Sequence, residues 1–569
     1  MVRFTYLMAF SAKRRSLWRI AVAGTLLAAC AQAQVVHSAD SERPAVHLAS
    51  DWISEGQSDA SGAVGQRYSN RAALAAVRSP AHLAEAYLTE GGREGRFVFN
   101  AANLRARVAA DSQQGVFIAP AAAPSGASGA WVRAYSGALN IKWFGATPND
   151  ATDDTAAIEG ALSMAGEIFV PPGTYRHAPS AATGFLSNTT IFGSGNESVI
   201  KYAPLSPPRW TDIQQVLRPR AYANVDNVVI RDLVIDGNRD GVDWRRIPGD
   251  GDAYGIGLWG TQNVVLDNVE VRNAYTDAFL LAYSHSSRRD RRNTRNVRFG
   301  NLRAINSGRQ GMSIISAEGV TGSHLHVDTV NRSSPRAALD MEPNVTAPDL
   351  VKDIDIDQVT ARNVGAGVLI AGVSAVQDVT IGSIIVENVT HTLGLSITKA
   401  RNVQIGSARI AMGNGLYYGF YATDFDNVRI GSLAITQVPG AINGTNGGAL
   451  VDHLPAGNTF TNRGLRIDRF LIDGAKGTGF RHNAGTISLG HAEARNVNQV
   501  NNGSWAFYLA GSAEIENLVS TDGTPAYPLA LGSNTNRIVS GDVARGTEGG
   551  ILLGGFRADL GSLRERGRP

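Results

Sequence analysis

The stretch Asn227-Val-Val-Ile-Arg-Asp-Leu-Val-Ile235 decides the fold, because its pattern returns along the chain. Each copy opens with Asn or Asp and then Val, and apolar residues follow in alternation. Such alternation predicts a β-strand rather than a helix. Most neighbouring copies lie about 23 to 36 residues apart, a spacing typical of a solenoid. The further copies are Asn263-Val-Val-Leu-Asp-Asn-Val-Glu-Val271, Asn296-Val-Arg-Phe299, Asp378-Val-Thr-Ile-Gly-Ser-Ile384, Asn402-Val-Gln-Ile405 and Asn427-Val-Arg-Ile-Gly-Ser-Leu433.

Strands repeated at this spacing, with no helical pattern between them, predict a parallel β-helix over residues 141–555. The composition agrees with an all-β protein rich in turns, because 63 of the 569 residues are Gly and only 18% are charged. The net charge of +3 is too small for a nucleic-acid-binding surface. The flat wall of such a coil suits an extended polymer, and nothing in the sequence points to a cofactor.

The N-terminus, residues 1–33, is similar to a bacterial export signal. Lys13-Arg14-Arg15 precedes a short apolar stretch from Ile20 to Cys30. Cys30 is the one cysteine of the chain, which excludes disulfides and cysteine-based metal sites. Its context resembles a lipobox, so lipidation at Cys30 would give the only membrane attachment, whereas ordinary cleavage after Ala33 fits equally. Either alternative predicts export to the periplasm, the outer membrane or the medium.

Residues 34–140 do not share the repeat and are expected to form a small α+β domain. Ala72 to Tyr87 is alanine-rich and is expected to be helical. Arg96–Phe99 and Gly115–Ile118 read as short strands. Residues 556–569 are expected to be a C-terminal tail.

A resemblance to a known family begins at Ile141-Lys-Trp-Phe-Gly145 and continues through Asp150–Ile158 and Gly166–Tyr175. These segments resemble the opening of the pectate-lyase-like superfamily, which includes polygalacturonases and tailspike depolymerases. The resemblance implies a right-handed parallel β-helix, a helix from Asp153-Asp154-Thr155 that caps its open end, and, by analogy with trimeric tailspikes, a homotrimer. Asp and Thr are good N-cap residues, so these aspartates are interpreted as structural.

A second strand phrase alternates with the first, as in Gly311-Met-Ser-Ile-Ile315 and Ala338-Leu-Asp-Met-Glu342. Its apolar residues are expected to point inward and its polar and aromatic residues outward. Such an outward row offers rings for stacking and hydroxyls for hydrogen bonds to a sugar. The substrate-binding candidates in this row are Trp259, Ser313, Ser396 and Tyr421, with Thr398 and Thr423 beside them.

Asp340 and Glu342 are the catalytic candidates, because residues two apart on a strand project from one face. Their backbone separation would be about 6.6 Å, two strand rises. Glycoside hydrolysis needs one protonated and one ionised carboxyl group, and mutual repulsion separates the two pKa values. Ala338-Leu-Asp-Met-Glu-Pro-Asn344 also resembles a segment of β-helix depolymerases that follows an Arg-Asn-Gly turn, read here as Arg309-Gln310-Gly311. The alternative is a purely structural role, in which Asp340 and Glu342 are an exposed acidic pair held by Arg309 or Arg336.

Three further candidates flank this pair. Asp277 resembles the Asn-Thr-Asp aspartate of polygalacturonases, although the other motifs of that group are missing; it is a third acid or a turn cap. Tyr283 and His285 lie beside the arginine-rich insertion 288–295, which would favour an acidic glycan or be a solvated loop. His324 and His326 alternate on one strand, but no third metal ligand follows at matching spacing.

Three functions are consistent with these residues. The leading one is an exported glycoside hydrolase that uses Asp340 and Glu342, oriented by Arg309, with Asn344 among the substrate contacts. The second is a polysaccharide lyase or uronate epimerase. The third is a non-catalytic glycan-binding surface protein.

Overall fold

The computed structural model describes residues 66–78, 80, 85–179, 184–203, 215–241, 253–284, 291–344, 349–414, 417–437, 448–499, 503–521 and 525–566. The export signal, Cys30 and His285 lie outside these residues. Contacts divide the chain into the units Met1–Val46 and His47–Pro569, and everything described belongs to the second. No helix among the described residues is long and apolar enough to span a membrane.

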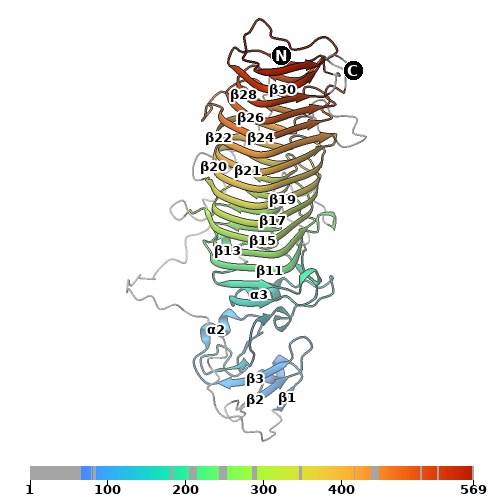
Figure 1. Cartoon of the computed structure of the whole chain (residues 1–569). Helices are drawn as coiled ribbons and strands as arrows, with labels where there is room; N and C mark the ends of the chain where they lie inside the picture. The colour runs from blue at the N-terminus through green and yellow to red at the C-terminus, as the bar shows by residue number, and fades with distance from the viewer. Residues whose placement is uncertain are drawn as a thin grey trace, which may run out of the picture. The chain divides into compact units, whose positions relative to one another are not determined.

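The predicted parallel β-helix is confirmed: its strands form one 26-stranded sheet that winds up the molecule (Figure 1). From β11 to β19, long strands alternate with short ones, and each strand pairs in parallel with the strand two places along. One coil therefore holds one long and one short strand. The first strands are β6 (Leu139–Asn140), β7 (Gly166–Phe169), β8 (Gly173–His177), β9 (Thr189–Phe192), β10 (Ser198–Tyr202), β11 (Asp226–Asp236), β12 (Ile256–Trp259), β13 (Gln262–Arg272), β14 (Asp277–Ala282), β15 (Thr294–Ser307), β16 (Gln310–Ile314), β17 (Ala317–Val330), β18 (Ala337–Met341) and β19 (Val351–Val364).

Later coils fuse the two strands into longer ones before they separate again. The longest, β20, covers Ala366–Val389 because its short and long parts join without a break. The remaining strands are β21 (Leu395–Met412), β22 (Phe420–Gln437), β23 (Ala449–Val451), β24 (Arg463–Asp473), β25 (Phe480–His482), β26 (Thr486–Arg495), β27 (Trp505–Leu509), β28 (Ser512–Ser520), β29 (Tyr527–Leu531), β30 (Asn536–Ala544) and β31 (Ser562–Arg566).

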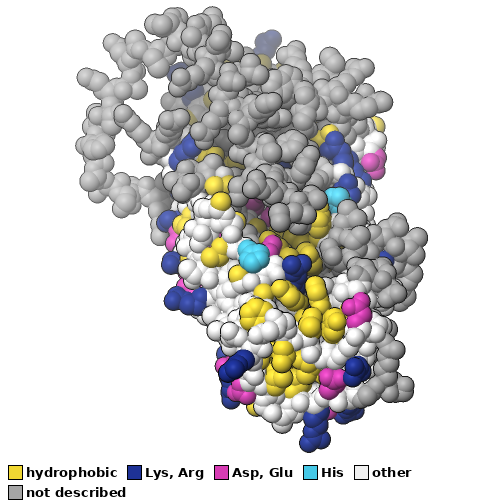
Figure 2. Space-filling view, turned by 90° about the horizontal axis from the view of Figure 1, so that it is seen from above, with side chains coloured by type: hydrophobic (Ala, Val, Ile, Leu, Met, Phe, Trp, Pro, Cys, Tyr) yellow, Lys and Arg dark blue, Asp and Glu magenta, His cyan; other side chains and the backbone are white. Residues whose placement is uncertain are grey.

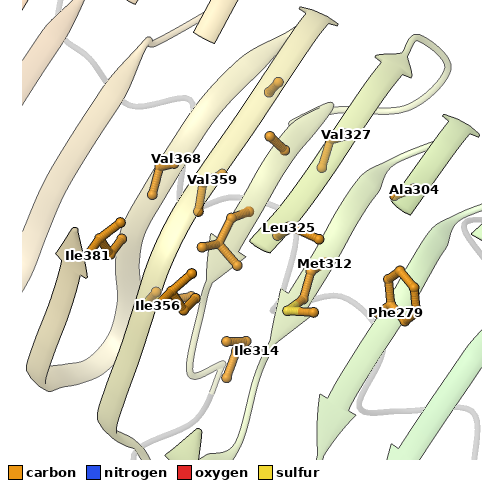
Figure 3. Packing of buried hydrophobic residues seen from close by; sticks show 14 of the residues in the cluster. Phe279, Ala304, Met312, Ile314, Leu325, Val327, Ile356, Val359, Val368 and Ile381 are labelled. Atoms are coloured by element: carbon orange, nitrogen blue, oxygen red, sulfur yellow. The ribbon is translucent and has the colours of Figure 1, made fainter. Parts of the chain in front are cut away.

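The interior is a column of aliphatic side chains, each stacked on its counterpart in the next coil. Met312, Leu339 and Val368 occupy one such row, in register between neighbouring strands and fully buried. Figure 3 shows Met312, Ile314, Leu325, Val327 and Val359 packed together in this core. The Val that follows each repeated Asn, for example Val264, is also buried, so the repeat marks where each coil enters the core.

The repeated Asn has a structural reason of its own. Asn227, Asn263 and Asn296 have φ values of 59°, 55° and 53°, in the left-handed region that Asn tolerates better than other side chains. The Asn263 amide donates to Asn227 Oδ1 at 3.1 Å, and the Asn296 amide donates to Asn263 Oδ1 at 3.1 Å. The Asn residues therefore form the turn and also link one coil to the next.

The predicted helix at the start of the solenoid is confirmed as α3 (Thr155–Leu162): Asp153 Oδ1 accepts from the Thr155 N–H at 3.0 Å, but Asp154 acts differently than expected. Asp154 occupies the N-cap position without a side-chain capping bond. Its carboxylate instead accepts hydrogen bonds from the backbone N–H groups of Thr147 and Arg176, at 2.7 and 3.1 Å. Asp154 thus ties the segment before the helix to strand β8.

The N-terminal part contains a five-stranded sheet and two short helices. Its elements are β1 (Gln66–Tyr68), α1 (Arg71–Ala75), β2 (Glu85–Leu88), β3 (Gly95–Asn100), α2 (Arg105–Ala110), β4 (Phe117–Ile118) and β5 (Ala130–Arg133). The helix expected from Ala72 to Tyr87 is wrong beyond Ala75, since Pro80 disfavours helix and residues 85–88 pair with β3. The Arg93 guanidinium donates to the carbonyls of Trp143 and Phe144, which joins this sheet to the opening turn of the solenoid.

The last described residues extend the solenoid beyond the expected boundary at 555. Strand β31 pairs in parallel with β30, so part of the expected C-terminal tail adds a strand to the sheet. Figure 2 views the molecule from above and shows hydrophobic side chains from the middle to the lower part of the view, with Lys and Arg mostly toward the margins. Leu552, Leu553 and Phe556, close to this end in sequence, are exposed.

Candidate active site

Asp340 points away from the core, as expected, but it is not exposed. It lies on β18 between the core residues Leu339 and Met341 and is in register with Ser313 of the preceding coil. Only 2% of its surface is accessible. An outward-facing strand position is thus covered by other parts of the protein.

A chain of hydrogen bonds fixes one oxygen of this carboxyl group. Gln310 Nε2 donates to Asp340 Oδ2, and Ser313 Oγ donates to Gln310 Oε1. Among the described residues no donor bonds to the other oxygen, Oδ1, and this atom is not completely buried. Oδ1 is therefore the oxygen that remains available for proton transfer.

Burial raises the pKa of Asp340 well above its ordinary value, and the neighbouring Glu342 carboxylate raises it further. The positive charge of Arg309 and the bond from Gln310 oppose this shift. Asp340 is therefore a carboxyl group that keeps its proton at a pH where a free aspartate has lost it. That is the property of a general acid.

Glu342 is the exposed member of the pair. It directly follows β18, and its backbone N–H donates to the Ile314 carbonyl at 3.0 Å, which anchors it to the preceding coil. Desolvation by the surrounding protein raises the pKa of Glu342, while the charge of Arg309 lowers it. The residue is therefore open to solvent, although the surrounding protein still removes part of its hydration.

Arg309 binds Asp277 rather than the carboxylate pair. Its Nε donates to Asp277 Oδ1 at 2.8 Å and its Nη2 to Oδ2 at 2.5 Å, a two-pronged ion pair between neighbouring coils. Asp277 is completely buried and the Arg309 side chain is 22% exposed. Asp277 is therefore neither a free acid nor a simple turn cap: it holds Arg309 where the arginine's charge acts on both Asp340 and Glu342.

The other candidates are distributed along the outer wall. The expected open sugar platform at Trp259 needs correction: the residue is 6% exposed, packs in an outer cluster with Tyr254, Leu280 and Ala282, and donates its indole N–H to Gln215 Oε1 at 2.8 Å. The ring stays inaccessible because apolar neighbours cover it. Ser313 and Ser396 are likewise buried.

Three candidates remain accessible at least in part. Tyr283 is half-buried, with the Arg291 guanidinium 5.1 Å from its ring centre. Asn344 is exposed, and its backbone N–H donates to Asp349 Oδ2 at 2.8 Å. Tyr421 is half-buried three coils beyond Asp340 in the same outward row.

The two strand histidines share one partner. His324 Nε2 and His326 Nδ1 lie 2.8 and 2.9 Å from the hydroxyl oxygen of Thr360. In the described part of the chain, no group of three or more His, Cys, Asp or Glu residues is arranged to hold a metal ion. Both histidine rings instead take part in a hydrogen-bond network with the Thr360 hydroxyl group.

Gln310 is the site residue that the sequence did not single out as functional. Arg309 binds Asp277, and Gln310 begins β16 in register with Ala337, from where its side-chain amide reaches Asp340. No signal in the sequence pointed to it, because residues three apart, such as Gln310 and Ser313, project from opposite faces of a regular strand.

Comparison with known proteins places residues 138–334 in a sequence match to the family described as "Rhamnogalacturonase A/epimerase, pectate lyase-like". A mannuronan C5-epimerase of Azotobacter vinelandii, AlgE3, is 35% identical over 147 residues, 24% of this chain and 8% of that protein. Alginate lyase 7 of the same organism is 34% identical over 152 residues, 25% of this chain and 17% of that protein. The chain thus spans less than a fifth of the length of these two relatives.

Solved structures that align with this chain include the following two. The A-module of mannuronan C-5 epimerase AlgE4 from Azotobacter vinelandii aligns with a TM-score of 0.38 and 14% identity, covering 74% of this chain and 99% of the module. The tailspike gp49 of the Acinetobacter baumannii bacteriophage Fri1 aligns with a TM-score of 0.42 and 13% identity, covering 75% of this chain and 74% of the tailspike.

Proposed function

We propose that this chain, whose residues 138–334 match a pectate-lyase-like family, is an enzyme that cleaves a polysaccharide with Asp340 and Glu342 as its catalytic pair. The observation that carries the proposal is the unequal carboxyl pair: burial raises the pKa of Asp340 strongly, and Glu342 beside it is exposed. One group is suited to hold a proton and the other to meet substrate. Glycoside hydrolysis requires one protonated and one ionised carboxyl group, and the pKa of Asp340 is raised more strongly than that of Glu342.

In this mechanism the Asp340 proton passes from Oδ1 to the glycosidic oxygen as the bond to the anomeric carbon breaks. Glu342, as the carboxylate, removes a proton from the attacking water or attacks the anomeric carbon itself. Gln310 holds Asp340 Oδ2, which keeps Oδ1 directed away from the bonded side. Desolvation and the Asp277 charge raise the pKa of Glu342, and the positive charge of Arg309 opposes them by favouring its ionised state.

Uronate chemistry at C5 is a second candidate, favoured by the names of the relatives, which are mannuronan C5-epimerases and an alginate lyase. Here Glu342 would take the C5 proton. In a lyase, a C4–C5 double bond then forms as the C4–oxygen bond breaks and Asp340 protonates the leaving oxygen. In an epimerase, a proton returns to the opposite face of C5.

A polysaccharide panel separates these reactions. Purified mature protein is incubated in D2O with acidic and neutral polymers, and reducing ends, ultraviolet absorbance and deuterium at C5 are followed together. Hydrolysis predicts new reducing ends without absorbance. A lyase predicts reducing ends with the absorbance of an unsaturated uronide, and an epimerase predicts deuterium without new ends. Binding without any of these products would identify a non-catalytic glycan-binding protein and refute the enzymatic proposal.

Export belongs to the same proposal, since a polysaccharide of this kind lies outside the cytoplasm. Either residues 1–29 would be removed, with Cys30 as the first, lipidated residue, or residues 1–33 would be removed by cleavage after Ala33. Mass spectrometry of the mature N-terminus distinguishes the two processing sites. An intact Met1 on the cellular protein would refute export through this segment.

A further inference from the structure

A cluster of aromatic and charged side chains lies on the outer wall several coils beyond the acidic pair. We call it the distal aromatic patch: Tyr418, Tyr421, Asp452, Arg481, Trp505 and Tyr508. The rings of Tyr418 and Tyr421 stack with centres 6.5 Å apart, and those of Trp505 and Tyr508 lie 5.0 Å apart. All four rings are half-buried, so part of each ring reaches the surface.

The patch lies in the same outward row as Asp340. The register runs from Asp340 through Leu369 and Ser396 to Tyr421, and from there through Leu450 and Arg481 to Tyr508. Because neighbouring strands are about 4.8 Å apart, Tyr421 lies about 14 Å and Tyr508 about 29 Å along the wall from Asp340. A single sugar cannot reach both places, whereas an extended chain can.

Arg481 gives the patch a preference for negative charge. It is exposed, its guanidinium lies 5.5 Å from the centre of the Tyr508 ring, and its Nε donates to Asn483 Oδ1 at 2.9 Å. Within the described ranges no carboxylate forms an ion pair with it. The nearby Asp452 accepts instead from the Asn483 amide, at 2.9 Å, and from the Tyr421 hydroxyl, at 3.5 Å. The remaining N–H groups of Arg481 are therefore free to bind a carboxylate on a ligand.

Two ring pairs, and an arginine without an ion-pair partner among the described residues, form the kind of surface that binds the apolar face and the carboxylate of an acidic sugar. We propose that the distal aromatic patch is a second binding site for the polysaccharide, that it recognises a carboxylate-bearing chain, and that it holds this chain several sugars away from the acidic pair. This inference rests on the proposed function for its connection to catalysis, but binding at the patch is a separate property.

The test uses the full mature protein carrying Asp340→Asn, which removes the proposed acid and leaves the patch intact. Affinity for alginate, for polygalacturonate and for neutral dextran is measured by retardation in native gels. Arg481→Gln and Tyr508→Ala, each in this background, are expected to weaken binding of the acidic polymer by about tenfold, the effect of losing one charge-assisted hydrogen bond or its supporting ring. Tyr508→Phe is expected to bind like the parent.

Tyr87→Ala is the matched control, because Tyr87 on β2 is also exposed and also has an arginine, Arg67, over its ring at 5.3 Å. It lies far from the patch in sequence and is expected to leave binding unchanged. Equal binding by the Arg481→Gln, Tyr508→Ala and Tyr87→Ala variants would overturn the inference. Stronger retardation by dextran than by the acidic polymers would overturn its charge preference.

Turnover by the protein with native Asp340 separates this inference from the proposed function. If acidic polymer is bound through the patch but never converted, the enzymatic proposal fails and the binding site stands. If polymer is converted but the patch variants have the KM of the native protein for polymer as well as for short oligosaccharides, the distal site fails and the enzymatic proposal stands. The expected result is a raised KM for polymer alone.

Discussion

Removal of the negative charge of Asp277 tests how the site is held together. Asp277→Asn keeps the shape of the side chain but leaves the Arg309 guanidinium without its carboxylate. Breaking a buried ion pair costs about 3–5 kcal/mol. Because the Arg309 side chain is 22% exposed and water can reach it, we expect a somewhat smaller cost, about 2–4 kcal/mol.

The same change has a predictable effect on the acidic pair. The Asp277 charge helps to raise the pKa of both Asp340 and Glu342, and Arg309 lowers it. In Asp277→Asn the arginine acts without that opposition, so the pKa of Asp340 falls and the acid loses its proton at a lower pH. The alkaline limb of the pH–rate profile should move toward lower pH.

Urea denaturation followed by circular dichroism, together with pH–rate profiles, checks both effects. Asp426→Asn is the matched control: Arg463 donates to Asp426 through Nε and Nη2, at 3.1 and 3.2 Å, also between coils, but its side chain is 70% exposed. Exposed pairs contribute about 0–1 kcal/mol. Equal destabilisation by the two variants, or an alkaline limb that stays in place in Asp277→Asn, would refute the reasoning.

Three further predictions concern single residues. Asp340→Asn should abolish turnover and raise thermal stability at neutral pH. Because the folded-state pKa of Asp340 is raised, the native protein loses stability as the pH rises from the unfolded-state pKa toward the folded-state pKa. The variant avoids this loss, so its gain in stability should vanish in acid. Gln310→Leu removes a bond that favours the ionised Asp340, so the alkaline limb of its pH–rate profile should move to higher pH; a shift to lower pH would contradict this. Asn263→Ala should destabilise the protein by about 1 kcal/mol more than Asn263→Gly, because only the methyl group is strained at φ 55°, and equal urea midpoints would argue against that strain.

Much of the fold could be predicted from the sequence because strand period and direction are local properties. Alternation assigned Leu339 and Met341 to the core and Asp340 to the outer face, and the structure agrees. The repeated Asn was visible as a motif, although its positive φ and its coil-to-coil bonds were not. What alternation cannot state is how far an outward residue is covered by the rest of the chain, which is why Trp259 was expected to be open.

The electrostatic partners were also out of reach of the sequence. Arg309 lies close in sequence to Ser313 and in the coil before Asp340, yet it pairs with Asp277, which is 32 residues away. That choice depends on register between coils and on complete burial of Asp277. Likewise, Trp505 and Tyr508 follow coils where the repeated phrase fades, so their alignment with Tyr421 emerged only from the strand pairing.

The most direct test of the account compares turnover of one responsive polysaccharide by the native protein, Asp340→Asn and Glu342→Gln, each shown to be folded by circular dichroism. Loss of a general acid or base lowers the rate by about 10²–10⁴-fold, so the turnover rate of both variants should fall by at least about 10²-fold while they still bind the polymer. Turnover at the native rate by either variant would contradict the assignment of this carboxyl pair to catalysis.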